Sequence, residues 1–475
     1  MNNSYNFNLI KQCFKFLIPE NKRVLYLGIM GDELLPYIKP YYAVCVSDEV
    51  IHEFQPEEKF DYIIMDEAIG KTEDISALLS NISPACNTQT RIIIHQRNHL
   101  WEGILKLSSK FGLKKKERTQ NWLSVDDVRT YLNMAGFETT RTFRKTIFPR
   151  NFLFTGTLMN FIFNIIPFFD FLKLDEFIIA RQRFNSQNNY TLSLTICITV
   201  KDEEHNIQPL VEELPVLCEE QEILFVEGHS TDKTVDEILR MQKLYPLKNI
   251  RIVKQPDKGQ GDAIKTGFKI AHGDIIILYE GDGTSSKSDI QYFYNAMKDG
   301  IFEFIEGSRL VYPVDRQSMP LINKIGNVIF ARLFSFFLNQ RTTDVLSGIK
   351  AILKKDFDTI YDTWGFIGIN DPFGDFELLF GSARYGLKIG EIPIHYKPRR
   401  HGVSKTNVFK HGWYLLRMSI MGYFIFRNSR ITSHEKKLTQ KVKHITNHYS
   451  QITNHKSLIT NDNESPPVFT IYRRS

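Results

Sequence analysis

Residues 274–283 read Asp-Ile-Ile-Ile-Leu-Tyr-Glu-Gly-Asp-Gly. The apolar run from Ile275 to Leu278 predicts a fully buried strand of a parallel sheet. The strand leads into two carboxylates one residue apart, Glu280 and Asp282. Ligands of open α/β sheets bind beyond the carboxyl ends of the strands, so an acid-x-acid pair here suits a divalent cation that also contacts substrate phosphates. A solvated acidic turn is the alternative, because Glu, Gly and Asp are ordinary turn residues.

Strands and helices alternate on both sides of this stretch, from Thr191 to about residue 400. The expected strands are 192–200, 222–226 and 250–254, and the expected helices are 206–217, 232–244 and 260–271. Such alternation is typical of βαβ crossovers, and it predicts a mainly parallel sheet.

A second alternating region lies nearer to the amino terminus. Its expected strands are 23–27, 42–46, 60–65 and 91–95, with a helix at 75–81. A turn that contains Gly28 and Gly31 follows the first strand, which is how cofactor-binding α/β domains begin. The chain of 475 residues is long enough for both domains to have cores of their own.

Charge and cysteine content narrow the possible partners. The chain has 60 Lys and Arg against 54 Asp and Glu, and residues 396–443 hold twelve of these cations with a single acid, Glu435. Such a block indicates an anionic substrate or membrane surface, and no nucleic acid is expected because no base-stacking pattern accompanies it.

The five cysteines show no CxxC spacing, and the chain begins without a signal-peptide pattern. We therefore expect a cytoplasmic protein without disulfides or zinc.

Three segments interrupt or follow the two domains. Residues 147–190 form an apolar but broken stretch and a polar linker, expected to be helical and to pack against the second domain or lie on a membrane surface. Residues 406–430 carry an apolar stripe at helical spacing, which fits either the core or a membrane interface. Residues 431–475 are polar and are expected to be disordered. No clean membrane span is expected.

Seven motifs between residues 191 and 405 resemble, in order, those of family-2 glycosyltransferases. They are 198–207, 224–234, 257–274, Glu280-Gly-Asp282-Gly283 in place of the family's D-x-D, Gly307-Ser308-Arg309, Asp344 to Gly348, and 396–405, which is similar to an R-x-x-G-x-S-K segment. The resemblance is greatest to polyprenyl- and dolichyl-phosphate mannosyl- or glucosyltransferases. It implies a GT-A fold for 191–405, a nucleotide-sugar donor, Mg²⁺ or Mn²⁺, and inversion at the anomeric carbon.

The resemblance and the residue chemistry together give each candidate residue a role. Carboxylates that end strands are expected to reach the base or ribose of the donor, cations to bind phosphate, and an acid before an apolar helix to act as general base or to position the acceptor. The expected donor-binding residues are Thr199, Glu203, Glu227, Lys258, Gly259, Glu280 and Asp282, the last two also being metal ligands. The expected acceptor-binding residues are Arg309, Arg399, Ser404 and Lys405, and the expected catalytic acids are Asp375 and Glu377.

Two of these assignments keep alternatives. Glu203 fits equally an acid that complements a helix dipole. Asp375 and Glu377 are expected to lie on different faces of a helix, so only one is expected to point inward, and we favour Asp375.

Residues 20–145 resemble class I S-adenosylmethionine-dependent methyltransferases, on the strand 24–27 with Gly28, the strand 61–64, and the stretch from Trp122 to Glu138. The family's glycine-x-glycine-x-glycine turn is replaced by one that holds Gly28 and Gly31. The sequence therefore leaves two interpretations equally open, a domain that binds no cofactor and an active methyltransferase. S-adenosylmethionine is accordingly an uncertain cofactor.

The sequence thus predicts an α/β protein with two Rossmann-like domains, a methyltransferase-like domain at 1–146 and a GT-A domain at 191–405. The expected function is metal-dependent, inverting transfer of a hexose from a nucleotide sugar to a polyprenyl phosphate or an envelope glycan, on the inner face of the plasma membrane. The alternatives are a non-catalytic nucleotide-sugar-binding scaffold and a bifunctional glycosyltransferase and methyltransferase.

Overall fold

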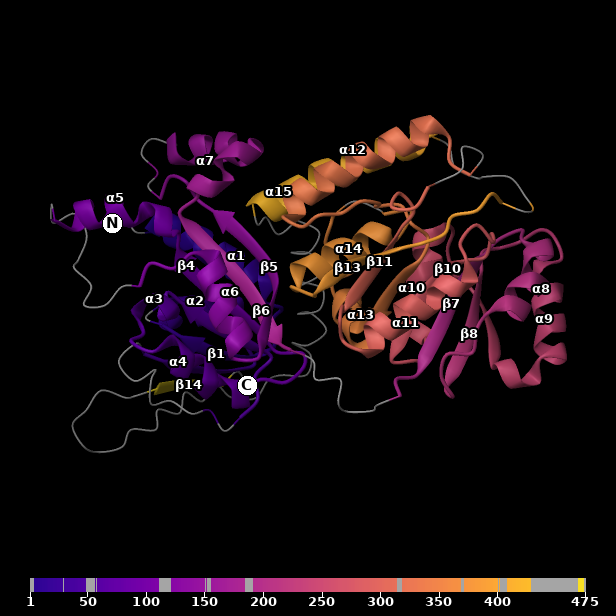
Figure 1. The fold of residues 1–475 in the computed structure, drawn as a ribbon, viewed down its shortest axis with the longest axis horizontal. Coiled ribbons are helices and arrows are strands. Elements are labelled where there is room, and N and C mark those ends of the chain that lie inside the picture. The colour runs from indigo at the N-terminus through magenta and orange to yellow at the C-terminus, as the bar shows by residue number, and fades with distance from the viewer. Residues whose placement is uncertain are drawn as a thin grey trace, which may run out of the picture. The chain divides into compact units, whose positions relative to one another are not determined.

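The computed structural model describes residues 4–28, 30–47, 56, 58–110, 121–149, 151, 155–183, 191–313, 318–368, 371–399, 401, 408–428 and 469–473. The chain divides into two compact units, both drawn in Figure 1. The first comprises the described residues up to Arg183 with the strand at 469–473, and the second extends from Thr191 to Phe426.

The first unit contains a seven-stranded sheet in the order β14-β2-β1-β3-β4-β6-β5. The strands β2, β1, β3 and β4 are parallel, whereas β6 is antiparallel to β4 and β5, and β14 is antiparallel to β2. The strands are β1 (Arg23–Leu27), β2 (Tyr42–Val46), β3 (Tyr62–Asp66), β4 (Arg91–Arg97), β5 (Phe137–Lys145), β6 (Asp175–Gln182) and β14 (Phe469–Arg473).

The helices of this unit begin at the amino terminus and alternate with the strands. The α-helices are α1 (Ser4–Leu17), α2 (Gly31–Ile38), α3 (Ala68–Lys71), α4 (Ile75–Ile82), α5 (Glu102–Lys110), α6 (Val125–Met134) and α7 (Thr155–Ile165). Short 3₁₀ helices are η1 (Ser83–Ala85), η2 (His99–Trp101) and η3 (Pro167–Leu172). The strands expected from the sequence are present. The sheet buries β1, β3 and β4 almost throughout, as apolar runs require, whereas Tyr42 and Cys45 of β2 are half-buried.

Two expectations for segments outside the domains are wrong in part. The stretch expected to be a helical connector does contain α7 and η3, but it also supplies β6, which lies inside the first sheet between β4 and β5. The acids Asp175 and Glu176 that open β6 are buried and pair with Arg97 and Arg144, so their charges do not mark a loop. Residues 469–473, within the tail expected to be disordered, form β14.

The second unit contains a seven-stranded sheet in the order β13-β11-β12-β10-β7-β8-β9. The sheet is mainly parallel, as expected, and β12 is antiparallel to both of its neighbours, β10 and β11. The strands are β7 (Leu194–Val200), β8 (Gln221–Glu227), β9 (Ile250–Lys254), β10 (Ile275–Glu280), β11 (Phe304–Ser308), β12 (Lys350–Leu353) and β13 (Ile389–Pro393).

The helices of the second unit cover the sheet (Figure 1). They are α8 (Glu204–Glu213), α9 (Thr234–Leu244), α10 (Gln260–Ile270), α11 (Ile290–Lys298), α12 (Leu321–Leu338), α13 (Lys354–Tyr361), α14 (Asp375–Arg384) and α15 (Val408–Asn428), with 3₁₀ helices η4 (Pro246–Lys248) and η5 (Lys287–Asp289). The strand expected at 275–278 is confirmed as β10, and those four residues are fully buried. A Cβ at Gly273, just before it, would lie 2.4 Å from the backbone nitrogen of Thr195, so this close approach of β7 requires glycine.

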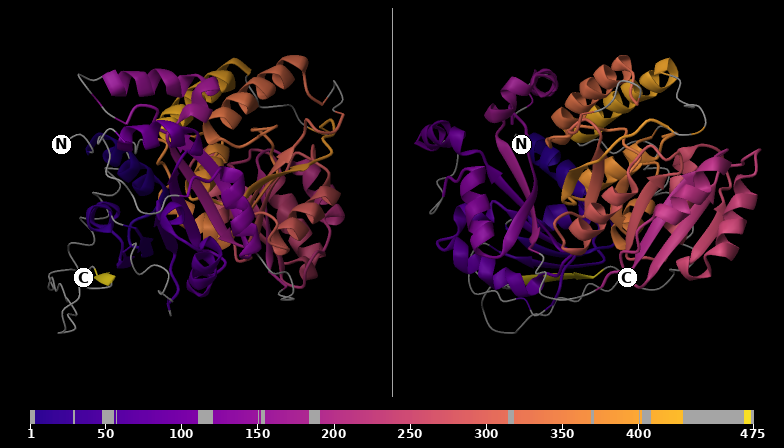
Figure 2. Two further views of the ribbon diagram at one scale, coloured as in Figure 1. Left: turned by 60° about the vertical axis from the view of Figure 1, so that its left-hand side comes forward. Right: turned by 45° about the vertical axis from the view of Figure 1, so that its right-hand side comes forward.

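The helices α12, α14 and α15 pack through a cluster of phenylalanine rings. Phe334 and Phe337 of α12 contact Phe380 of α14, and Phe426 of α15 contacts both Phe337 and Phe380. Gly422 lets α15 approach, because a Cβ there would lie 2.5 Å from the Phe337 ring. Figure 2 shows α12 and α15 side by side. Every residue of α14 is buried.

Candidate active site

The carboxyl ends of β7, β8 and β10 meet at one edge of the second sheet. Thr199 on β7 pairs with Glu280 on β10, and Glu227 closes β8, the strand on the other side of β7. Glu203 follows β7 and Asp282 follows β10. The structure therefore brings the carboxylates that the sequence assigned to the donor to the same edge, and it buries most of their surface.

The turns that follow β7 and β8 hold each other in place. Asp202, with a left-handed φ of 50°, accepts a hydrogen bond from the backbone N–H of Thr231 at 2.7 Å. The hydroxyl of Thr234 accepts one from the backbone N–H of Glu203 at 2.8 Å. These hydrogen bonds between neighbouring turns fix the backbone of Glu203, and they thereby help to hold its carboxylate in position.

Asp282 directs its two oxygens to different partners. Oδ1 accepts hydrogen bonds from the backbone N–H and the hydroxyl of Thr284, at 3.0 and 2.8 Å. Oδ2 accepts one from the guanidinium of Arg399 at 2.6 Å, and the same guanidinium reaches Oε1 of Glu203 at 3.5 Å. Arg399, which the sequence assigned to the acceptor, thus lies on two donor-side carboxylates.

Glu280 does not stand beside Asp282 as a second open carboxylate. Its Oε1 accepts a hydrogen bond from Gln260 at 2.9 Å, and its side chain packs on Gly348, where a Cβ would come within 2.2 Å of it. Burial raises the pKa of Glu280, and the nearby charge of Asp282 raises it further. The expectation that Glu280 ligates the metal does not fit this placement.

Asp282 alone still suits a hard cation. Among the residues that the structure describes, no cluster of three or more His, Cys, Asp or Glu side chains could hold a metal ion by itself. Mg²⁺ in nucleotide sites is typically held by one or two carboxylates, with substrate phosphates and water completing its coordination. The residues present therefore fit a cation that arrives with a diphosphate and is held by Asp282.

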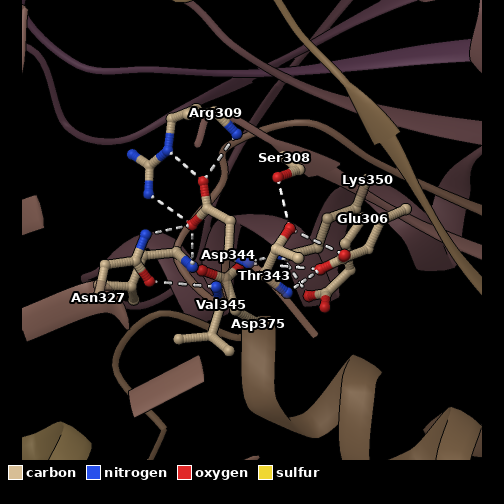
Figure 3. A network of polar contacts seen from close by, with 11 residues as sticks. Glu306, Ser308, Arg309, Asn327, Thr343, Asp344, Val345, Lys350 and Asp375 are labelled. Atoms are coloured by element: carbon tan, nitrogen blue, oxygen red, sulfur yellow. Dashed lines mark hydrogen bonds and ion pairs between the residues drawn. The ribbon is translucent and has the colours of Figure 1, made fainter. Parts of the chain in front are cut away.

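Arg309 is committed to the protein rather than open to a ligand (Figure 3). Its Nε and Nη2 donate to the two oxygens of Asp344 at 2.7 and 2.8 Å, and Asn327 of α12 donates to the same carboxylate at 2.7 Å. Although burial acts against ionisation, the guanidinium of Arg309 lowers the pKa of Asp344 to about 2. The fork that was expected to bind an acceptor phosphate is occupied by this bidentate pair.

Lys350 was not foreseen from the sequence, although it is the most buried cation of the site. It opens β12 with a side chain that is 0% exposed, donates to Glu306 at 2.9 Å and lies 3.7 Å from Oδ1 of Asp375 (Figure 3). Burial opposes its charge, but the two carboxylates keep the pKa of Lys350 above its ordinary value. A lysine at the start of an apolar strand is the only signal the sequence offers.

Asp375 and Glu377 are both buried, so the expectation that only one points inward is wrong. The reason is that α14 is covered on all sides, and a helix buried all round has no outer face. Burial raises the pKa of each carboxylate to about 8, with Lys350 opposing the shift of Asp375. Neither Oδ1 of Asp375 nor Oε2 of Glu377 has a hydrogen-bond partner among the described residues.

A third acid, Asp371, caps the helix α14 that carries Asp375 and Glu377. Oδ2 of Asp371 accepts hydrogen bonds from the backbone N–H groups of Phe376 and Glu377 at 2.9 and 3.1 Å, and Oδ1 accepts one from Phe373 at 3.0 Å. Asp371 therefore satisfies two of the orphan donors at the amino end of α14, those of Phe376 and Glu377. This cap fixes the start of the helix and with it the place of Asp375.

The remaining candidates lie at the rim or outside the described residues. Lys258 is exposed, and Gly259, with φ of 100°, precedes α10 in a conformation that favours glycine. Ser404 and Lys405 lie outside the described residues.

The glycine turn of the first unit is packed against the unit's own atoms. A Cβ at Gly28 would lie 2.8 Å from the backbone oxygen of Asp66, and one at Gly31 would lie 2.3 Å from the sulfur of Cys45. The hydroxyl of Tyr26 donates to Asp66 at 2.6 Å beside the turn. Atoms of the unit itself thus fill space next to this turn, for which the sequence leaves cofactor binding open.

Comparison with known proteins finds similarity within the second unit. Residues 195–361 match the family described as glycosyl transferase family 2. The chain is 25% identical over 236 residues to the low-salt glycan biosynthesis hexosyltransferase Agl6 of Haloferax volcanii, which covers 48% of this chain and 53% of that protein. It is 27% identical over 191 residues to the dolichyl-phosphate hexose transferase of the same organism, and this match covers 40% of this chain and 76% of that protein.

The chain thus spans about half the length of the first relative. Among solved structures, glucosyl-3-phosphoglycerate synthase of Mycobacterium tuberculosis aligns with a TM-score of 0.36 and 14% identity, over 51% of this chain and 83% of that one. The sequence matches show a family 2 glycosyltransferase domain at 195–361 and support a glycosyltransferase. The family match includes no residue before 195, so the methyltransferase resemblance stays a prediction.

Proposed function

We propose that the second unit transfers a hexose from a nucleotide sugar to a polyprenyl phosphate or a related glycan acceptor. The observation that supports this most directly is the gathering of Glu203, Glu227 and Asp282 at the carboxyl edge of a sheet whose sequence matches family 2. Ligands of open α/β sheets bind at this edge. A nucleotide sugar needs hydrogen-bond acceptors for its nucleoside and compensation for its diphosphate, and these residues offer both.

The nucleoside lies towards β7 and β8, where the carboxylates of Glu203 and Glu227 accept hydrogen bonds from the base or ribose. Asp282 would hold Mg²⁺ or Mn²⁺ together with the diphosphate, and a cation bound there would supply positive charge against the negative charge of the departing nucleoside diphosphate. Lys258, exposed at the start of α10, adds a further positive charge near the phosphates.

The transfer inverts the anomeric carbon in one displacement. The acceptor oxygen forms a bond to that carbon as the bond to the diphosphate oxygen breaks, and the nucleoside diphosphate leaves with both bonding electrons. We assign to Asp375 the role of general base or of an acid that positions the acceptor. A phosphate acceptor is already anionic and needs little help from a base, so with such an acceptor positioning is the larger part of its role.

The acceptor class draws support from the relatives and from the surface of the second unit. One relative is named a dolichyl-phosphate hexose transferase. The helix α12 exposes Leu321, Ile322, Ile325, Ile329 and Leu333, and α15 exposes Trp413, Leu416 and Ile420. The predicted stripe of α15 is therefore exposed at these three positions rather than buried in the core.

Both helices fit a membrane interface better than a span. Within the described part of the chain, α12 is long and apolar enough to cross a membrane by length and composition, contrary to the expectation of no clean span. Its inner side, however, holds Asn327 on Asp344 and Phe334 on α14. A helix tied to its domain along one side lies in the plane of the interface, with its exposed apolar side chains among the lipids.

Calorimetry on the full-length protein tests the proposed function. GDP-mannose, UDP-glucose and UDP-N-acetylglucosamine are titrated with and without Mn²⁺ into the wild type, Asp282→Ala and the matched control Glu280→Gln. We expect one donor to bind the wild type in a metal-dependent way, Asp282→Ala to lose that dependence, and Glu280→Gln to keep it. A folded protein that binds no donor, or that shows no metal-dependent hydrolysis of the donor it binds, would favour a non-catalytic scaffold.

A further inference from the structure

The guanidinium of Arg399 joins two carboxylates that come from different strand ends. It donates to Oδ2 of Asp282 at 2.6 Å and lies 3.5 Å from Oε1 of Glu203. Asp282 follows β10, and Glu203 follows β7. One cation therefore spans the proposed diphosphate end and the proposed nucleoside end of the donor site.

The contact uses the oxygen that a metal would need. Oδ1 of Asp282 is engaged by Thr284 through two hydrogen bonds, which leaves Oδ2 as the outward ligand, and Arg399 holds it. Like charges repel at short range, so a divalent cation bound to this oxygen weakens the contact that the guanidinium makes there.

The backbone that carries Arg399 is tied down two residues earlier. The N–H of Lys397 donates to the backbone oxygen of Thr284 at 2.7 Å, and Tyr396 forms a bridge with Ser285. The segment is therefore fixed beside the turn that holds Asp282. The arginine side chain has freedom that its backbone lacks, because it is long and 23% exposed.

We infer that Arg399 is an exchangeable counterion of the donor site. A metal-bound donor displaces Arg399, and its guanidinium then binds the acceptor phosphate. This inference rests on the proposed function. In the unloaded protein Arg399 neutralises Asp282 and Glu203. When the cation and the diphosphate occupy these carboxylates, the guanidinium moves to a phosphate, for which its fork geometry is suited.

The exchange has a thermodynamic consequence. Because donor binding releases Arg399, it strengthens binding of the acceptor phosphate, and by linkage the acceptor strengthens donor binding by the same factor. Acceptor phosphate binds weakly before the donor, which disfavours a dead-end complex of enzyme and lipid.

Metal binding in the presence of the nucleoside diphosphate of the donor found by calorimetry tests the exchange apart from catalysis, because the cation is held by Asp282 together with a diphosphate. Free Mn²⁺ is measured by electron paramagnetic resonance during titration of the wild type, Arg399→Ala and the control Lys397→Ala. Lys397 lies on the same segment and carries the same charge, but its contact with Thr284 is made by its backbone. Loss of one charge-assisted hydrogen bond to the carboxylate predicts that Arg399→Ala binds Mn²⁺ about tenfold more tightly than the wild type. Lys397→Ala should stay within about twofold of the wild type, as expected for loss of an exposed charge.

A second titration separates two ways in which the inference can fail. Binding to vesicles that contain a short polyprenyl phosphate is measured with and without Mn²⁺ and the nucleoside diphosphate of the donor found by calorimetry. The wild type should bind these vesicles more tightly with the nucleotide present, and Arg399→Ala should not respond to the nucleotide.

The outcomes separate the exchange from the function it rests on. If the wild type transfers hexose but Arg399→Ala binds Mn²⁺ no more tightly than Lys397→Ala, the exchange is wrong and the proposed function stands. If Arg399→Ala instead loses nucleotide binding, Arg399 is a donor ligand and the exchange is again wrong. If no nucleotide sugar binds any of the proteins, the proposed function fails and the exchange fails with it.

Discussion

Asp375 should lower the stability of the folded protein at neutral and alkaline pH, and its replacement by Asn should reveal this. Burial raises its pKa from 3.8 to about 8. The folded protein therefore keeps a proton that the unfolded chain releases between these two values, so stability falls as pH rises through this window. The neutral Asn side chain has no such dependence and is close to Asp in size.

The magnitude follows from the pKa values. One pKa unit corresponds to about 1.4 kcal/mol. Between about pH 5 and about pH 8 the free energy of unfolding of the wild type therefore falls by at most about 4 kcal/mol relative to that of Asp375→Asn. The charges of Lys350 and Glu306 act on Asp375 together, so this value is an upper limit, and we expect the stability difference between the two proteins to grow by about 1–3 kcal/mol. Urea unfolding of both proteins at the two pH values measures it.

A matched control distinguishes this effect from a general response of buried acids. Asp371 is also buried, but its two oxygens accept three backbone hydrogen bonds at the start of α14. Asp371→Asn should therefore destabilise the protein by about 1–3 kcal/mol at about pH 8, because one oxygen becomes an amide that cannot accept. The reasoning about Asp375 is refuted if Asp375→Asn is less stable than the wild type at the higher pH, or if the difference does not change with pH.

Two further predictions concern the buried cation and the exposed helices. Lys350→Met should lower the free energy of unfolding by about 3–5 kcal/mol, because it leaves the carboxylate of Glu306 buried without its partner; urea unfolding measures this, and Lys350→Met with Glu306→Gln should recover part of the loss. Ile329→Glu on α12 should weaken sedimentation with anionic vesicles by about tenfold, as expected when a charge replaces an apolar side chain at a lipid interface. Leu244→Glu on α9 is the matched control, because Ile329 and Leu244 are equally exposed at 53%, and equal loss in both variants would contradict an interface formed by α12.

The alternating strands of both domains could be predicted because their signal is local. An apolar run such as Ile275–Leu278 has one stable place in a sheet, buried on both faces, and the structure puts it there. The strand β6 could not be recognised in the same way. Its opening acids are stable inside the first unit only because Arg97 and Arg144 from other strands pair with them, and such pairs are invisible until the strands are placed side by side.

The same limit applies to the candidate site. The carboxylates at the strand ends could be located because strand ends are set by the sequence, but the direction of each side chain depends on neighbours far along the chain. Glu280 turns to Gln260 and Gly348, and Arg309 turns to Asp344, contacts that join residues 20 to 68 positions apart. Lys350 was missed because its role arises from the acids that surround it and not from its own segment.

The supply of cations decides what the acceptor side can bind. Of the two acceptor cations that the sequence predicted and the structure describes, Arg309 is held by both oxygens of Asp344, and Arg399 lies on Asp282. Lys350 is sealed in the interior, so it cannot reach a phosphate. Among the residues that the structure describes, a guanidinium therefore becomes available to a phosphate acceptor only after the donor has displaced Arg399 from Asp282. A hydroxyl acceptor would need no such release, and its binding should not respond to the nucleotide. The dependence of acceptor binding on the donor thus separates a lipid phosphate from a glycan hydroxyl.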